Sequence, residues 1–175
     1  MKHFVFLKGV NVGPTTRVDM KLLQARLEGM DLTASTFLNS GNVVVEGCRS
    51  ATEAEKRVAE AVREVSDLDV AVVARTPEQV RATIQGSPFG GKGCDQSHAL
   101  AYFGERKLPV EKASELGRLK GMVEEYQCER DVLHVHYPDG IGRSKFTTAW
   151  IDKSLGVRTT GRNLDTLRKL LEKFG

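Results

Sequence analysis

A glycine-containing segment near the N-terminus has the composition of a phosphate-binding loop. The sequence "GVNVGPTTRVDM", residues 9–20, places two glycines, an asparagine and an arginine just before a helical pattern. Glycines let backbone N–H groups come close to an anion, and the start of a helix attracts negative charge. The segment matches neither nucleotide-binding signature, because it lacks the G-K-[ST] ending and a third glycine, and Pro14 removes one donor. The alternative is a tight turn with positive φ angles at Gly9 and Gly13.

Two later segments combine arginines with hydroxyl groups. "PDGIGRSKF", residues 138–146, has an Arg-Ser-Lys run in which the serine is placed to cap the next helix. "VRTTGRNL", residues 157–164, has two arginines around two threonines before the last helical pattern. Arginine forks and hydroxyls at a helix N-terminus can hold an anion, and they can equally cap helices and tether neighbouring elements. Both interpretations stay open.

The turn "NSGN" between two predicted strands supplies further polar groups, although hairpin chemistry alone explains its composition. All of these segments lie in predicted loops or at element ends, where a rigid scaffold commonly places binding groups. We expect them to converge on one positively charged hollow. The candidate ligand-binding residues are Lys8, Asn11, Arg17, Ser40, Asn42, Arg143, Ser144, Lys145, Arg158, Thr160, Arg162 and Asn163.

The sequence contains no recognisable catalytic or metal-binding constellation. His134 and His136 lie two residues apart on a predicted strand and therefore share one face, but a metal would need a third ligand. We expect a solvent-facing histidine pair. Neither a G-x-S-x-G elbow nor an H-E-x-x-H motif is present, and no local pair of acids suggests acid/base work. The sequence predicts no catalytic residue, no metal site and no cofactor.

The composition indicates an ordinary globular protein. The 175 residues are 40% hydrophobic and 28% charged, with a net charge of +3. Basic residues gather in the last 35 positions, as an anionic partner or a solvated final helix would explain. No apolar run is long enough for a membrane span, and the N-terminus does not resemble a signal peptide. Three widely spaced cysteines argue against a disulfide framework, so we expect a cytoplasmic protein.

The first half of the chain alternates strand and helix patterns in the order β-α-β-β-α-β of ferredoxin-like domains. The predicted strands are residues 3–8, 33–39, 41–47 and 68–75, and the first predicted helix is residues 18–30. The second helix begins with a capping box formed by Thr52 and Glu55, and its apolar stripe contains Val58, Val62 and Val65.

The pattern restarts after a helix capped by Thr76 and a glycine-rich stretch at residues 86–98. Strands are predicted at residues 99–105, 124–130, 132–137 and 157–161. Three helices are predicted as well: a weak one at residues 113–123, one around Phe146, Trp150 and Leu155, and a last one lined by Leu164, Leu167, Leu171 and Phe174. The predicted class is α+β, with two ferredoxin-like subdomains and a C-terminal helix. The subdomains are residues 1–75 and 97–175, joined by residues 76–96.

The segments "FLKGVNVG", "VDMKLLQARLEGM", "TFLNSGNVVVEG", "YPDGIGRSK" and "RTTGRNLDTLRKL" together resemble an uncharacterised bacterial family catalogued as domain of unknown function 1697. The resemblance spans nearly the whole chain and implies two ferredoxin-like subdomains, but no established activity. The chain departs from the family form at Lys8, where arginine is expected, at Pro14, where a second glycine is usual, and at Leu164, where a tryptophan follows the asparagine. These differences remove a bidentate fork, a backbone donor and a stacking surface.

The leading functional hypothesis is a binding module for a small anionic ligand, nucleotide-like or phosphorylated. Nucleic acid is a weaker hypothesis, since Phe4, Phe6, Tyr102 and Phe103 could stack on bases but no RNA-binding consensus is present. Two more hypotheses are an enzyme acting on a phosphorylated metabolite, with Asp139 or a histidine as proton carrier, and a self-associating structural protein. No membrane partner is expected, and the oligomeric state stays open.

Overall fold

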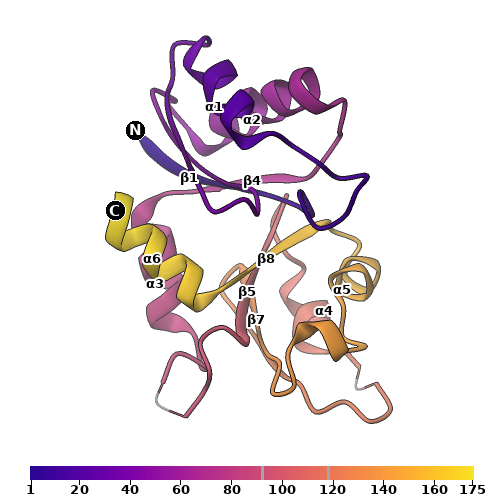
Figure 1. Cartoon of the computed structure of the whole chain (residues 1–175). Coiled ribbons are helices and arrows are strands. Elements are labelled where there is room, and N and C mark those ends of the chain that lie inside the picture. The colour runs from indigo at the N-terminus through magenta and orange to yellow at the C-terminus, as the bar shows by residue number, and fades with distance from the viewer. Residues whose placement is uncertain (92, 118) are drawn as a thin grey trace. The chain divides into compact units, whose positions relative to one another are not determined.

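The computed structural model describes residues 1–91, 93–117 and 119–175. Lys92 of the predicted glycine-rich loop and Arg118 of the predicted helix 113–123 lie outside the described residues. The chain divides into two compact units, Met1–Gln79 and Val80–Lys173. Each unit contains a four-stranded antiparallel sheet with helices packed on it (Figure 1). The fold is α+β, with two ferredoxin-like subdomains and a C-terminal helix, as the sequence predicts.

The first unit follows the predicted order of elements. They are β1 (Lys2–Leu7), α1 (Met20–Glu28), β2 (Thr33–Phe37), β3 (Asn42–Glu46), α2 (Ala51–Ser66) and β4 (Val72–Arg75). The strands lie in the order β2-β3-β1-β4, so β1 is paired on both sides. Its Phe4 lies opposite Val44 of β3 and Arg75 of β4. This central strand leads directly into the candidate loop at residues 9–20.

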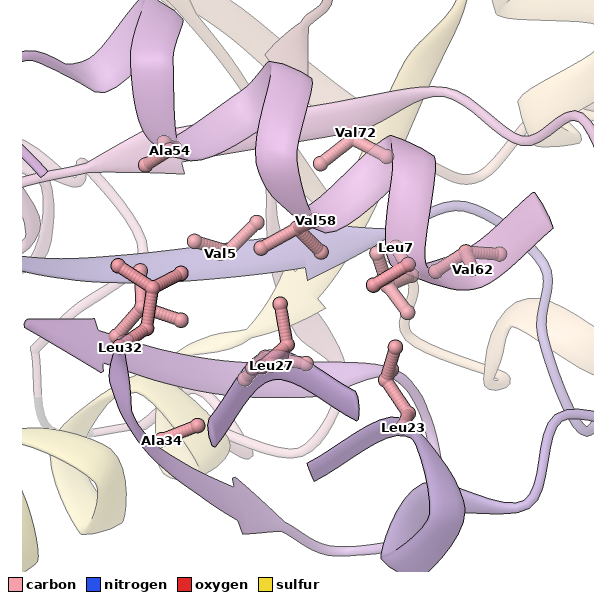
Figure 2. Packing of buried hydrophobic residues seen from close by; sticks show 14 of the residues in the cluster. Val5, Leu7, Leu23, Leu27, Leu32, Ala34, Ala54, Val58, Val62 and Val72 are labelled. Carbon is pink, nitrogen blue, oxygen red and sulfur yellow. The ribbon is translucent and has the colours of Figure 1, made fainter. Parts of the chain in front are cut away.

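The core of the first unit lies between the sheet and the helices α1 and α2 (Figure 2). Alternation along β1 sends Val5 and Leu7 into this core, because successive side chains of a strand point to opposite faces. They share one buried cluster with Leu27 of α1 and with Val58 and Val62 of α2. Each fully buried aliphatic side chain of this kind contributes about 1.5–3 kcal/mol.

The start of α2 differs from the prediction. The N-cap is Ser50, whose Oγ accepts the N–H of Glu53 at 3.1 Å, and Glu53 accepts the N–H of Arg49 at 2.9 Å. The predicted capping box of Thr52 and Glu55 is therefore wrong by two residues. Glu55 instead accepts a backbone N–H of β4 at 2.9 Å, and burial raises the pKa of its carboxyl group.

The second unit repeats the sheet topology with further helices. The elements after β4 are α3 (Pro77–Gly86), β5 (Ala99–Gly104), α4 (Val110–Ser114), β6 (Glu125–Glu129), β7 (Val132–His136), the 3-10 helix η1 (Ile141–Arg143), α5 (Thr148–Leu155), β8 (Thr159–Asn163) and α6 (Leu164–Phe174). The strand order is β6-β7-β5-β8. Helices α4 and α5 cover one face of this sheet, and α3 and α6 lie on the other (Figure 1). The predicted cap of α3 is confirmed, since Thr76 Oγ1 accepts the N–H of Gln79 at 3.2 Å.

Two predicted helices of this unit need correction. The helix predicted at 113–123 is replaced by the five-residue α4, because Gly117 and Gly121 follow it and Gly121 has a φ of 75° that no helix tolerates. In the last helix, the predicted core residues Leu164 and Leu167 are buried. The third buried residue is Leu170, and the predicted Leu171 is only half-buried.

A buried chain of hydroxyl groups crosses the core between the sheet and α5. The hydroxyls of Tyr102 and Tyr137 lie 2.7 Å apart, and Tyr137 donates to the carbonyl of Phe146 at 2.8 Å. Because Tyr137 has only one proton to donate, Tyr102 must be the donor in the first bond. Burial raises the pKa of both phenols, so they stay protonated.

The described residues contain neither a membrane-spanning helix nor a metal-binding cluster. Within residues 1–91, 93–117 and 119–175, no helix has the length and apolar character needed to cross a membrane. The same residues contain no cluster of three His, Cys, Asp or Glu side chains that could hold a metal ion. Cys48, Cys94 and Cys128 are all free thiols.

Candidate functional site

The loop after β1 is held together by Asn11. This residue has a φ of 56°, and its side chain accepts the N–H of Val18 at 2.9 Å and donates to the carbonyl of Val18 at 3.0 Å. The backbone N–H of Asn11 is bonded to the carbonyl of Thr16 at 2.8 Å. The amide of Asn11 therefore closes the loop at residues 11–18 upon itself.

The glycines of this loop behave differently from each other. Gly9 has the predicted positive φ, at 62°, but Gly13 does not adopt the left-handed conformation. That expectation for Gly13 is wrong, because Asn11 takes the left-handed position instead. Asparagine adopts this conformation more readily than most residues with a Cβ.

An open pocket of about 810 Å³ adjoins the same loop. Arg17 is exposed on its wall and has no hydrogen-bond or ion-pair partner among the described residues. Lys8 does not line this pocket; it is half-buried, and its N–H is bonded to the carbonyl of Ala71 at 2.9 Å. The complete lining is Asn11, Val12, Gly13, Pro14, Arg17, Val18, Asp19, Met20, Lys21 and Asn39.

The turn between β2 and β3 uses its polar groups internally. Asn42 is fully buried, and its side chain donates to the carbonyl of Phe37 at 3.0 Å and to Oγ of Ser40 at 3.1 Å. Gly41, with a φ of 79°, packs against Leu7 and Val10 too closely for any side chain. These contacts give the turn the hairpin role that its composition indicates.

A second and more enclosed pocket, the loop pocket, lies in the second unit between the chain segments 119–124 and 139–145. Its volume is about 440 Å³. The structure brings three of the predicted site residues to it, Arg143, Ser144 and Lys145, and adds Lys120. Its complete lining is Leu119, Lys120, Gly121, Met122, Val123, Glu124, Asp139, Arg143, Ser144 and Lys145.

The cations of the loop pocket are exposed and unpaired. In the described part of the chain, the side chains of Lys120, Arg143 and Lys145 have no hydrogen-bond or ion-pair partner. Ser144 shapes the pocket wall by accepting the N–H of Phe146 at 2.9 Å. It does not cap α5 as predicted, because Thr147 is the N-cap of that helix.

Sequence reasoning missed Lys120 and its neighbours, because the pattern of residues 113–123 predicts a helix. The signal that could have found them is the dipeptide Lys120–Gly121. Glycine takes a positive φ more readily than any other residue, as Gly121 does at 75°, so a Lys-Gly pair favours a turn that presents the lysine to solvent.

The segment at residues 157–164 uses its polar side chains to hold the fold. Arg158 forms an ion pair with Glu105 at 2.9 Å. Arg162 donates to Oγ1 of Thr160 at 2.8 Å, and burial lowers the pKa of its guanidinium to about 10. Asn163 is the N-cap of α6. None of the four predicted residues in this segment lines the loop pocket.

The sequence predicts a solvent-facing histidine pair, and the structure shows that this prediction is wrong. His134 is only 2% exposed, and burial lowers its pKa to about 4. Its Nδ1 has no hydrogen-bond partner among the described residues. His136 is half-buried and stacks on Phe89, with ring centroids 5.7 Å apart.

Comparison with known proteins identifies the family and the fold. The family model described as "Protein of unknown function (DUF1697)" matches residues 1–134. The chain is also similar to the solved structure of the conserved bacterial protein SP0830 from Streptococcus pneumoniae, with a TM-score of 0.70 and 17% identity over 98% of this chain and 97% of that one. At this identity the likeness shows the fold alone. A search of curated proteins gives no match. Because the family model covers most of its length, the chain belongs to the DUF1697 family of proteins of unknown function.

Proposed function

We propose that the protein is a binding module for a small anionic ligand, phosphorylated or nucleotide-like, and that the loop pocket is its binding site. The observation that carries the proposal is the meeting of three unpaired cations, Lys120, Arg143 and Lys145, at one partly open pocket. Like charges brought together repel one another, and an anion bound between them would relieve this repulsion.

The charges of the pocket favour a phosphate group. Its lining also contains Glu124 and Asp139, so it holds three positive and two negative side chains. Glu124 accepts the N–H of Val123 at 3.1 Å, so one of its carboxylate oxygens is bonded to the backbone. A phosphate monoester carries up to two charges and can accept a bidentate pair of hydrogen bonds from the Arg143 guanidinium.

The proposal is tested by calorimetric titration with inorganic phosphate, pyrophosphate and AMP. We expect Arg143→Ala and Lys145→Ala each to weaken binding by about tenfold, the usual effect of removing one charged hydrogen bond. Lys153→Ala is the matched control, because Lys153 is an exposed cation of α5 outside the pocket lining. Absence of binding by all three anions, or equal losses in the three variants, would contradict the proposal.

An enzymatic role at the same pocket is the second candidate, favoured by Asp139 on its wall. A phosphorylated metabolite held by the cations would lie beside this carboxylate, which could act as the proton carrier. Asp139→Asn should then preserve AMP binding and abolish turnover of whichever phosphorylated metabolite the wild-type protein converts. A panel of phosphate esters that remains unchanged with wild-type protein would remove this candidate.

Nucleic acid binding receives less support from the structure. Phe4, Phe6, Tyr102 and Phe103 are completely buried, so their rings offer no surface for base stacking. RNA binding that weakens steeply with salt would nevertheless favour this function. Melting temperatures that rise with protein concentration would favour self-association. A cytoplasmic location is part of the proposal and agrees with three free thiols.

A further inference from the structure

The loop pocket has an apolar wall facing the same space as its cations. Leu119, Met122 and Val123 contribute this wall from one chain segment, and Arg143 and Lys145 line the pocket from the other. The third cation, Lys120, lies on the same segment as the apolar residues, so charged and apolar groups line one space. Leu119 and Met122 also pack against the buried core of the second unit, so the exposed Val123 is the part of the apolar wall most available to a ligand.

Two of the exposed large apolar side chains of the described residues belong to the two segments of this pocket. Val123 on the apolar wall is 53% exposed, and Ile141 of η1, between Asp139 and Arg143, is 41% exposed. Single exposed apolar residues are common on protein surfaces, and Ile141 does not line the pocket, but Val123 does and lies beside unpaired cations. A ligand with an apolar part bound in the pocket would cover Val123.

The size of the pocket agrees with such a ligand. Sites for small organic molecules occupy about 300–1,000 Å³, and the loop pocket has about 440 Å³. A single phosphate ion would leave much of this volume to water. A compact ring attached to the phosphate would fill it.

We infer that the ligand of the loop pocket is a phosphate monoester of a compact aromatic or nucleoside alcohol. The phosphate binds at Arg143 and Lys145, and the ring lies against Leu119, Met122 and Val123. This inference rests on the proposed function and adds the identity of the group that the phosphate carries. Met122 suits the flat face of a ring, because its flexible thioether adapts to the contact and sulfur interacts favourably with aromatic rings.

The test compares phenyl phosphate, inorganic phosphate and phenol by calorimetric titration of the full-length protein. Phenyl phosphate should bind at least about tenfold more tightly than inorganic phosphate, because burial of the ring adds hydrophobic free energy. Phenol alone should bind more weakly than phenyl phosphate, since it lacks the group that the cations hold. AMP, tested alongside, should bind at least as tightly as phenyl phosphate.

Single substitutions test the contributions of the apolar residues and of the cations separately. Val123→Asn and Met122→Ser should reduce the affinity for phenyl phosphate toward that for inorganic phosphate and leave the affinity for inorganic phosphate unchanged. Val110→Asn is the matched control, because Val110 is 39% exposed on α4 and does not line the pocket. Arg143→Ala should weaken the binding of both anions. Circular dichroism confirms that each variant is folded.

The outcomes distinguish the inference from the proposed function. Equal affinities of the wild-type protein for phenyl phosphate and inorganic phosphate would overturn the inference and leave the anion site intact. An equal loss of phenyl phosphate binding in Val110→Asn and Val123→Asn would also overturn it. Failure of every phosphate probe to bind would overturn both.

Discussion

Gly41 shows how one residue fixes the exit of the first strand. An added Cβ would lie 2.5 Å from Cγ2 of Val10 and 2.9 Å from Cβ of Leu7, and the φ of 79° already strains any residue other than glycine. We predict that Gly41→Ala lowers the free energy of unfolding by about 3 kcal/mol, since overpacking and backbone strain act together. Urea denaturation followed by circular dichroism measures this change.

Gly13 provides the control for that prediction in the neighbouring loop. No atom lies within 4 Å of a Cβ built there, and its φ is not in the left-handed region. Gly13→Ala should leave the unfolding free energy unchanged or raise it by about 0.5 kcal/mol, because alanine restricts the unfolded chain. Similar losses in both variants would show that loop sequence, and not the close packing at Gly41, decides stability.

The hydroxyl chain of Tyr102 and Tyr137 connects β5 and β7 to the segment that precedes α5. Tyr137→Phe removes the donor for the carbonyl of Phe146 and one of the two side-chain partners of the Tyr102 hydroxyl, the other being Thr148. We predict a loss of about 2 kcal/mol in unfolding free energy, because both remaining groups are buried. Tyr102→Phe should cost less, about 1 kcal/mol, since Tyr137 still donates to the carbonyl. Equal costs, measured by urea denaturation, would contradict the direction assigned to these bonds.

Most elements follow from the sequence because their apolar periodicity is unambiguous. The stripe Leu23–Leu27 predicts both a helix and its buried face, and the aromatic and β-branched side chains of residues 3–8 predict the strand β1. The predicted start of α2 is wrong by two residues, because Ser50–Glu53 and Thr52–Glu55 both fit the sequence pattern of a capping box. Only the fold decides between them, since the position of Glu55 lets it bind β4.

The candidate site was predictable in part. Arginine and lysine near glycines indicate exposed cations, and Arg143 and Lys145 do line a pocket. The same rule does not distinguish Arg162, which is buried and bonded to its own strand, because tertiary burial is not visible in local sequence. Whether Arg17 and the other residues of the first unit belong to the same site stays a prediction.

At the scale of the whole molecule, both units contain a buried histidine. Burial lowers the pKa of His3 in the first unit and lowers that of His134 in the second from 6.5 to about 4. Above pH 6.5 the unfolded imidazole is neutral as well, so stability is fully present. As the pH falls from 6.5 toward 4, protonation favours the unfolded chain, and His134 alone should remove up to about 3 kcal/mol.

The measurement is urea denaturation of wild-type protein and His134→Gln at pH 7.5 and pH 4.5. Wild-type protein should lose clearly more stability between these two conditions than the variant does, and His3 should account for part of the loss that remains. If the two proteins lose equal amounts of free energy on acidification, the burial of His134 does not control the acid sensitivity.

Trp150, the one tryptophan of the chain, lies on α5 with its ring 4.9 Å from that of Phe146. Phe146 is in turn bonded through its N–H to Ser144 on the pocket wall. Intrinsic indole emission therefore comes from the second unit, and ligands that rearrange the pocket wall would shift it. The first unit contains no such fluorophore, so the protein carries a built-in optical probe of the pocket that needs no label.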